Sequence, residues 1–196
     1  MPVYEVVERH HVGIAAPAPI TLAAAREMDL LRAPIVRALI KARELILGAT
    51  PDDRVRLRGL MAEVQTLGWR VLAEVPGREV VVGAVTKPWE ANVTFRGLPP
   101  DEFASFHEPD YLKIAWTLRA EPISATESIF RTETRVMTTD PAARAKFRWY
   151  WSFLSPGIIV IRWIALGPLK AEAERRAHAA DAGGQTPHLE AAGGAP

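Results

Sequence analysis

Hydrophobic side chains recur at every second position in several short segments, which is the period of a β-strand with one buried face. The clearest case is 111–120, where four apolar residues alternate with more polar neighbours: Leu112, Ile114, Trp116 and Leu118. The same pattern predicts strands at 4–14, 69–75, 78–86 and 127–137, a weaker one at 91–96 and an uncertain one at 103–107. Clustered strands joined by short turns, such as Pro76-Gly77, favour an antiparallel sheet.

Helical patterns precede and follow this group of strands. Two helices are expected near 19–30 and 33–47, and a third is expected to begin at 50–53 and to end near Gly68. The third has a good N-terminal signal, because Thr50 suits the N-cap, proline suits the first helical position, and two aspartates suit the positive end of the helix dipole.

The last helix is expected to open at Asp140-Pro141 and to fade near His178. Its apolar residues recur at spacings of three and four and form one stripe: Phe147, Trp151, Leu154, Ile158, Ile161 and Ala165. Pro156-Gly157 is expected to kink the helix, because proline removes a backbone hydrogen bond and clashes with the preceding turn. The stripe can cover the apolar face of the sheet, so the element order predicts an α+β fold.

Length and composition limit the class of protein further. The 196 residues suffice for one domain, expected at 1–178, and the end at 179–196 has little to bury and is expected to be a disordered tail. Lys and Arg number 24 against 23 Asp and Glu, so the net charge of +1 lacks the basic excess typical of nucleic-acid-binding modules. The absence of cysteine excludes disulfides, thiolate metal sites and cysteine nucleophiles.

Secretion and membrane signals are weak. The N-terminus MPVYEVVERHH has no basic region followed by an apolar one. The most apolar stretch, 153–169, is short for a bilayer span of about 20 residues and is interrupted by Arg162. We therefore expect a buried core helix, no stable membrane insertion, and a soluble cytoplasmic protein.

Four segments carry a resemblance to a known family: HHVGIAAPAPITLAAAREMDLL (10–31), GREVVVGAV (77–85), IFRTETRV (129–136) and FRWYWSFLSPGIIVIRW (147–163). Their order resembles that of the START-like superfamily, also called SRPBCC, which includes Bet v 1-like proteins and polyketide cyclases. They resemble in particular bacterial members of this group that have no assigned activity. The helix at 51–65 departs from the minimal pattern of the family.

The resemblance implies a helix-grip fold, in which a curved antiparallel sheet wraps around the long C-terminal helix, with short helices after the first strand. It also implies a hydrophobic cavity between sheet and helix. Members of the family bind or transport lipids, steroids and plant hormones, or cyclise polyketides. Because one fold hosts many activities, the resemblance is more specific for the fold than for the function.

Two predicted strands carry candidate ligand-binding residues. The charged residues of 127–137 share one face, which is either an exposed ladder of charges or a polar network inside the cavity. In the second case Glu133 and Arg135 would contact the ligand. In the preceding strand, Trp116 is either core or ligand contact, and Lys113 is a candidate polar anchor.

The last helix supplies a second group of candidates. Its inward side chains either line the cavity or simply pack the helix on the sheet: Phe147, Tyr150, Trp151 and Leu154. Tyrosine and tryptophan combine an apolar body with one polar group, which suits a hydrophobic pocket that must orient a ligand. Trp89 lies in an expected loop and is a candidate for closing the mouth of the cavity.

Histidine chemistry is sparse. His10 and His11 are neighbours and point to opposite faces of a strand, so they cannot chelate one ion together. His107 stands beside two carboxylates without a metal-ligand spacing, although its titration range suits a general base in a cavity. We expect no metal site and no cofactor. The chain has no nucleophile elbow, P-loop, dinucleotide-binding or zinc-protease motif.

The leading hypothesis is a non-enzymatic binding protein whose pocket, between the sheet and 145–165, holds a small hydrophobic or amphipathic molecule such as a lipid or polyketide. Its polar anchor would be Tyr150, Lys113, Glu133 or Arg135. The second hypothesis is a cyclase or hydratase acting on a polyketide-like substrate in the same cavity, with His107 or Glu133 as acid or base. The third is an interaction protein with a filled cavity. The sequence leaves a homodimer open.

Overall fold

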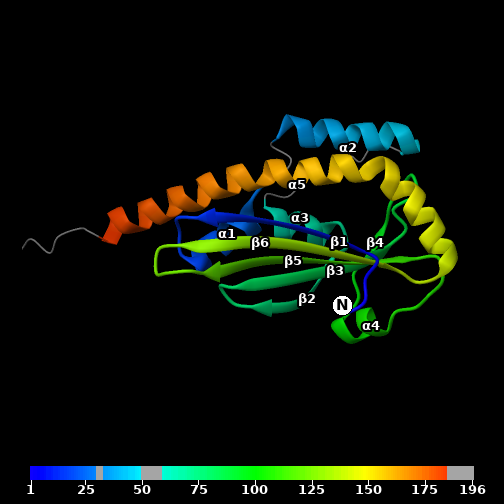
Figure 1. The fold of residues 1–196 in the computed structure, drawn as a ribbon, viewed down its shortest axis with the longest axis horizontal. Helices are drawn as coiled ribbons and strands as arrows, with labels where there is room; N and C mark the ends of the chain where they lie inside the picture. The colour runs from blue at the N-terminus through cyan, green and yellow to red at the C-terminus, as the bar shows by residue number, and fades with distance from the viewer. Residues whose placement is uncertain (30–32, 50–58, 185–196) are drawn as a thin grey trace, which may run out of the picture.

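The computed structural model describes residues 1–29, 33–49 and 59–184, which form one sheet and several helices (Figure 1). The strands are β1 (Val6–Ile14), β2 (Arg70–Val75), β3 (Glu79–Thr86), β4 (Phe95–Arg96), β5 (Leu112–Pro122) and β6 (Ser128–Thr138). The helices of this part of the chain are α1 (Ala18–Glu27), α2 (Pro34–Leu47), α3 (Leu60–Thr66), α4 (Pro100–Ser105) and α5 (Pro141–Gly184).

The sheet has the strand order β1-β6-β5-β3-β2, with β4 paired to β3, and every pairing is antiparallel. The register aligns Val82 with Trp116, Trp116 with Thr134, and Thr134 with Glu8, so one row of side chains crosses four strands. Because side chains alternate along a strand, this row and every second row beside it face the same way. We call this side, which also carries the buried Leu118, the inner face.

Helix α5 starts where its sequence signal predicts. Oδ1 of Asp140 accepts hydrogen bonds from the backbone N–H groups of Ala142 and Ala143 at 2.7 and 2.8 Å, which satisfies two donors that the helix itself leaves free. The helix bends in its yellow part and then runs along the sheet (Figure 1), and its sequence contains Pro156. The kink and the covering role predicted for this helix are therefore present, and the α+β helix-grip architecture is confirmed.

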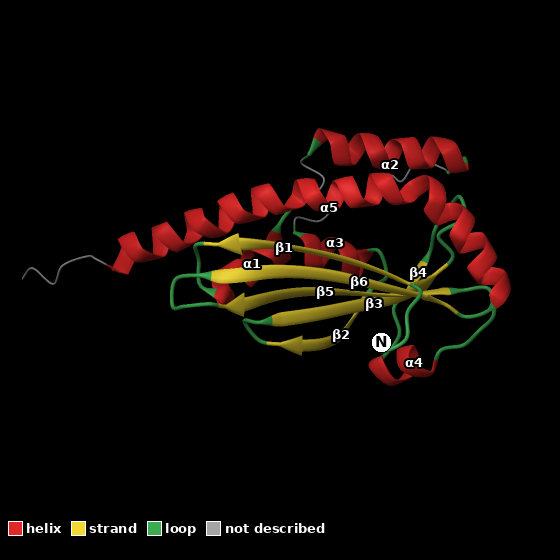
Figure 2. Cartoon of the chain, in the orientation of Figure 1, coloured by secondary structure: helices red, strands yellow, loops and turns green. Residues whose placement is uncertain are grey.

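Two of the remaining helices contact α5, whereas α4 packs against β2 and β3. Helix α1 packs against the inner face, since its Leu22 and Ala25 belong to the same core cluster as Leu118 and Phe130 of the sheet. Helix α2 lies on the side of α5 away from the sheet (Figure 2). The molecule therefore has a sheet layer, a helical layer that contains α1 and α5, and α2 outside them.

The core divides along α5. Under the first part of the helix, Phe147 and Tyr150 pack on Leu112 and Val136 of the sheet. Under the second part, a larger cluster joins the sheet to α1, α3 and α5 through small and aliphatic side chains, with Leu169 among the most buried. The bend therefore lets one helix cover both ends of the inner face.

Several element boundaries differ from the sequence expectations. The weak strand at 91–96 is reduced to Phe95–Arg96, and the uncertain strand at 103–107 is mostly the helix α4, which starts with Pro99-Pro100 and two acidic residues, all favourable at a helix N-terminus. The expected helix start at 50–53 lies outside the described residues. Helix α5 continues past His178 to Gly184, into the segment predicted as a disordered tail.

One side of α5 remains exposed. Phe153, Val160 and Trp163 lie on this side and are 67%, 41% and 73% exposed. By length and composition alone, an 18-residue stretch of α5 is apolar enough to cross a membrane, and 6% of that stretch is buried. The apolar segment 153–169 thus covers the sheet with one side only, and both the cytoplasmic location and the absence of membrane insertion remain predictions.

Candidate ligand-binding site

A cavity of about 220 Å³ lies between the inner face of the sheet and the second part of α5. Side chains from α1, α3, β5, β6 and α5 form its largely apolar wall: Ala25, Met28, Leu60, Trp116, Leu118, Phe130, Thr132, Ile158, Ile161, Arg162, Ala165, Leu166 and Leu169. The helix contributes residues spaced three and four apart, so they share one side of α5. The cavity therefore follows from the same apolar stripe that packs the helix on the sheet.

The strand register makes the inner face apolar in the middle of the sheet and polar toward its β1 edge. Leu118 of β5 pairs with Thr132 of β6, which in turn pairs with His10 of β1. In the next row, Trp116 is followed by Thr134 and Glu8. An apolar cavity wall and a group of polar side chains consequently lie side by side on the same face.

Arg162 is the charged residue of the cavity wall. Its guanidinium carbon lies 5.6 Å from the ring centroid of Trp116, within the range of a cation–π interaction. The indole is itself held in place, because its Nε1–H donates a hydrogen bond to Oγ1 of Thr132 at 2.7 Å. Nη1 of Arg162 is buried and has no hydrogen-bond partner among the residues that the structure describes. The guanidinium group of Arg162 is therefore held at the cavity by Trp116 and has an N–H donor that remains available.

Two more buried polar atoms lack hydrogen-bond partners in the described part of the chain. They are Nε2 of His10 on β1 and Oγ1 of Thr134 on β6. The histidine nitrogen is 3.8 Å from Oε2 of Glu8, which is too long for a hydrogen bond. Buried polar groups of this kind cost free energy unless something satisfies them. The group formed by Arg162, His10 and Thr134 therefore favours a bound polar group.

The charged groups of this region influence one another. Burial lowers the pKa of Arg162 to about 10, and the nearby Glu8 opposes this effect. Burial also lowers the pKa of His10, the positive charge of Arg162 lowers it further, and Glu8 opposes both. At neutral pH the site therefore presents a charged guanidinium beside a neutral imidazole.

The lowered pKa of His10 predicts a pH dependence of stability. The unfolded chain binds a proton at His10 near pH 6.5, whereas the folded protein binds it only at lower pH, so the free energy of unfolding falls as the pH drops below about 6.5. Urea unfolding at about pH 7.5 and about pH 5.5 should show a smaller loss for His10→Gln than for the wild type. The control is His107→Gln, because His107 is exposed. If the free energy of unfolding falls as much between the two pH values for His10→Gln as for His107→Gln, the prediction is contradicted.

Of the predicted ligand contacts, Trp116 lies in the cavity wall. Five others gather under the first part of α5, where Phe147 and Tyr150 are buried and the rest pack around them: Trp89, Trp151 and Leu154. The ring centroids of Phe147 and Trp151 are 5.6 Å apart. These residues pack the first part of α5 on the sheet, and Phe147 and Trp151 also line a separate hollow of about 420 Å³ beside β1, so their role as ligand contacts remains a prediction.

The two charged candidates on β6 lie on the outer face. Glu133 accepts hydrogen bonds from Nε of Arg9 and Nε of Arg135, both at 2.5 Å. Burial raises the pKa of Glu133, but the hydrogen bonds and charges of these arginines outweigh it and hold the pKa below its usual value. The inner face of β6 carries Thr132 and Thr134 instead, so Glu133 and Arg135 belong to a half-buried ladder of charges on the outer face and do not line the cavity.

Lys113 and His107 lie near α4, outside the cavity wall. The ammonium group of Lys113 is buried and donates to the backbone oxygens of Ala104 and Phe106 at 2.9 and 3.4 Å, and burial lowers its pKa. His107 is exposed, and its Nδ1 lies 2.7 Å from the Ser105 carbonyl oxygen. These contacts give Lys113 a structural role at the end of α4 and separate both residues from the cavity.

The sequence analysis did not select Arg162, Glu8 or His10 as site residues. A signal for them was present, because Glu8 and His10 share the strand parity of Val12, and Arg162 lies four residues after Ile158 on the apolar stripe. A charged residue on an apolar face marks either a buried partner or a ligand. Among the described residues, no group of three metal-ligating side chains is arranged to hold an ion.

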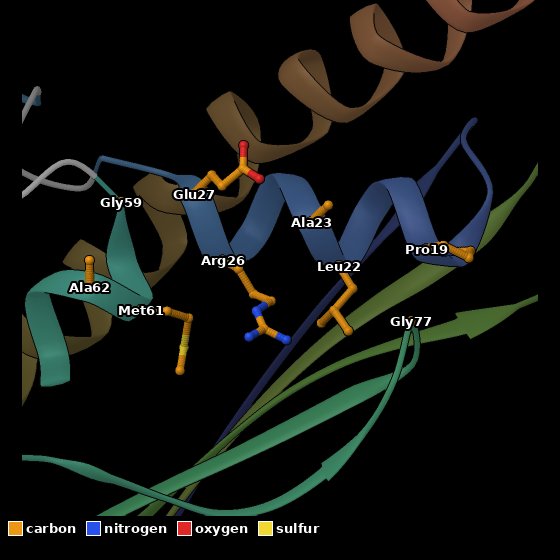
Figure 3. Close-up of a pocket in the computed structure, with 9 residues that line it drawn as sticks. All are labelled: Pro19, Leu22, Ala23, Arg26, Glu27, Gly59, Met61, Ala62 and Gly77. Carbon is orange, nitrogen blue, oxygen red and sulfur yellow. The ribbon is translucent and has the colours of Figure 1, made fainter.

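A second hollow, of about 400 Å³, lies between α1, α3 and the turn that joins β2 to β3 (Figure 3). The side chain of Arg26 extends from α1 into this region and pairs with Glu74, and Glu27 pairs with Arg176 of α5 at 2.8 Å. Because Arg26 and Glu27 both have partners, neither of these charged side chains is left unsatisfied for a ligand. The cavity under α5 is therefore the stronger candidate site.

Comparisons with known proteins found likenesses among solved structures only. No family model matches the chain, and no curated protein matches it significantly. The similar structures include a norcoclaurine synthase point mutant from Thalictrum flavum, at 9% identity and a TM-score of 0.39, with 87% of this chain and 95% of that chain covered.

Two further similar structures come from bacteria. An aromatase/cyclase from Streptomyces sp. R1128 has 16% identity and a TM-score of 0.27, with 89% of this chain and 97% of that chain covered. A hypothetical protein from Helicobacter pylori has 10% identity and a TM-score of 0.40, with coverages of 87% and 89%. Likenesses this distant carry no conclusion about ligand or activity. The helix-grip architecture rests on the strand order and on the position of α5.

Proposed function

We propose that this protein binds a small amphipathic molecule in the cavity between the inner face of the sheet and α5. The observation that carries the proposal is the combination of a largely apolar cavity of about 220 Å³ with a buried guanidinium nitrogen that has no partner. Ligand sites typically have this character, an apolar wall with a few polar groups that orient the ligand. Apolar burial would supply most of the affinity, at about 25 cal/mol per Å² before ordering costs are subtracted.

The other two hypotheses have less support from the geometry. A cyclase or hydratase needs an acid and a base that converge on one point, and the two residues suggested for these roles, His107 and Glu133, lie on an exposed loop and on the outer face. A protein with a filled cavity is less well supported, because the space under α5 remains open. Binding is therefore the function that the site favours.

Filling the cavity should abolish binding. Ala165 lies in the cavity wall, so Ala165→Phe places a ring in the space that the ligand would occupy. Native mass spectrometry of the purified wild type should show a co-purified small molecule, and the variant should lack it. The matched control is Ala171→Phe, on an exposed position of the same helix, which should retain the ligand.

Thermal denaturation provides the second measurement. Medium-chain acids and alcohols should raise the melting temperature of the wild type, since a ligand at 100 times its Kd stabilises the folded state by about 2.7 kcal/mol. Ala165→Phe should show less than a tenth of the wild-type affinity. The proposal fails if the wild type carries no small molecule and no compound in such a set shifts its melting temperature.

A further inference from the structure

Arg162 differs from the other arginines discussed above in how its charge is accommodated. Among the residues that the structure describes, no carboxylate forms an ion pair with this guanidinium, whereas Arg9, Arg131, Arg144 and Arg176 all pair with glutamates. Glu8 is near enough to influence the pKa of Arg162, but its carboxylate lies beside His10 at the edge strand. A buried cation that lacks a paired anion is costly, which explains why such groups usually mark a site.

The surroundings of Arg162 select the kind of group that would complete it. A guanidinium is a planar fork of N–H donors that matches a carboxylate, and the interaction strengthens where water is excluded. The indole of Trp116 covers the guanidinium at 5.6 Å, and apolar residues of α5 such as Ile158 and Leu166 form the adjoining wall. A ligand that suits both parts has a carboxylate at one end and an apolar body at the other.

The size of the cavity limits the apolar body. About 220 Å³ is less than the 300–1,000 Å³ typical of pockets for drug-sized ligands. A short alkyl chain or a single ring system fits this space better than a long-chain lipid. The volume therefore favours a ligand of medium size.

From these observations we infer that the ligand is a medium-chain carboxylic acid, bound as its anion with the carboxylate on Arg162 and the apolar chain in the cavity. This inference rests on the proposed binding function and specifies the ligand class. Arg162 is then a specificity-determining residue, because it distinguishes an acid from a neutral molecule of the same length. His10 and Thr134 lie on the strands beside it and have free polar atoms for the carboxylate or for a water bound to it.

The test compares two probes of equal chain length, octanoate and 1-octanol, by isothermal titration calorimetry at a pH of about 8, where a carboxylic acid is ionised. The wild type should bind octanoate at least about tenfold more tightly than octanol, the effect of one charge-assisted hydrogen bond. Arg162→Gln should remove this preference, because it should weaken octanoate binding much more than octanol binding. Arg162→Lys keeps the positive charge but lacks the planar set of N–H donors, so it should retain part of the preference for octanoate.

The matched control is Arg148→Gln, which removes an exposed arginine from the same helix and should leave both affinities unchanged. Octanol binding also reports on folding, since a variant with a disrupted cavity would lose both probes. Equal affinities of the wild type for the two probes would overturn the inference and leave the binding function standing. If neither probe binds, the inference fails, and the proposed function then stands or falls with the native mass spectrometry and the melting-temperature measurements described above. If Arg162→Gln weakens both probes equally, Arg162 is structural and the inference is wrong.

Discussion

Replacing Phe147 with alanine should lower the free energy of unfolding by about 3–5 kcal/mol, the range for removing a buried aromatic side chain. Phe147 is 3% exposed and packs with Leu112, Val136 and Tyr150 under the first part of α5. The truncation removes contacts from three elements at once and leaves a cavity that a rigid sheet cannot close. Urea unfolding followed by circular dichroism measures the change as a shift of the midpoint at constant slope.

Phe153→Ala is the matched control for this prediction. It removes the same side chain from the same helix, but Phe153 is 67% exposed. Its effect should stay within about 0.5 kcal/mol, as for most surface substitutions. Similar losses for both variants would contradict the assignment of an inward and an outward side to α5.

Gly68→Ala should be comparably destabilising, for a different reason. Gly68 has a φ of +97°, which L side chains rarely adopt, and a Cβ there would lie against the backbone oxygen of Phe95 well inside van der Waals contact. A backbone oxygen held by β4 cannot move as a side-chain end can. Strain and overpacking together should cost about 3–5 kcal/mol, measured by thermal or urea unfolding.

Gly48→Ala separates the two contributions. Gly48 has a φ of +67° at the end of α2, but a Cβ there would meet nothing within 4 Å. The free energy of unfolding should then fall by only about 1–2 kcal/mol, because alanine is strained in the left-handed backbone conformation but meets no neighbouring atom. If Gly68→Ala costs no more than Gly48→Ala, the close approach of β4 to the start of β2 is not as the structure describes it.

Most of the fold could be predicted from the sequence, because its elements are long and regular. The period-two pattern at 111–120 and the three-four stripe that includes Phe147 depend only on local geometry, so β5 and α5 follow from them directly. The short elements β4 and α4 were harder to predict. The two prolines and two acidic residues at 99–102 favour a helix start and outweigh the weak strand pattern at 103–107. A two-residue strand such as β4 depends on its partner rather than on its own sequence.

The site was less predictable, because the pattern of β6 is polar on both faces. Its threonines and its charged residues alternate, and only the packing of α5 decides that Thr132 and Thr134 face inward while Glu133 faces solvent. Sequence periodicity identifies the two faces of a strand but not which one is covered. For the same reason Arg162 looked like an interruption of an apolar helix and not like the charged residue of a cavity.

The alternation of side chains along the strands determines which property of the protein a substitution in the sheet affects. The inner and outer faces of the sheet are built from alternating residues of the same strands. On the side of the sheet, a single layer of backbone therefore separates the cavity from the outer face. Leu118 contributes to the wall, while its neighbour Arg119 contributes to surface charge through Glu79 and Glu121. A substitution at position 118 therefore changes the wall of the cavity, whereas a substitution at the adjacent position 119 changes the ion pairs of the outer surface.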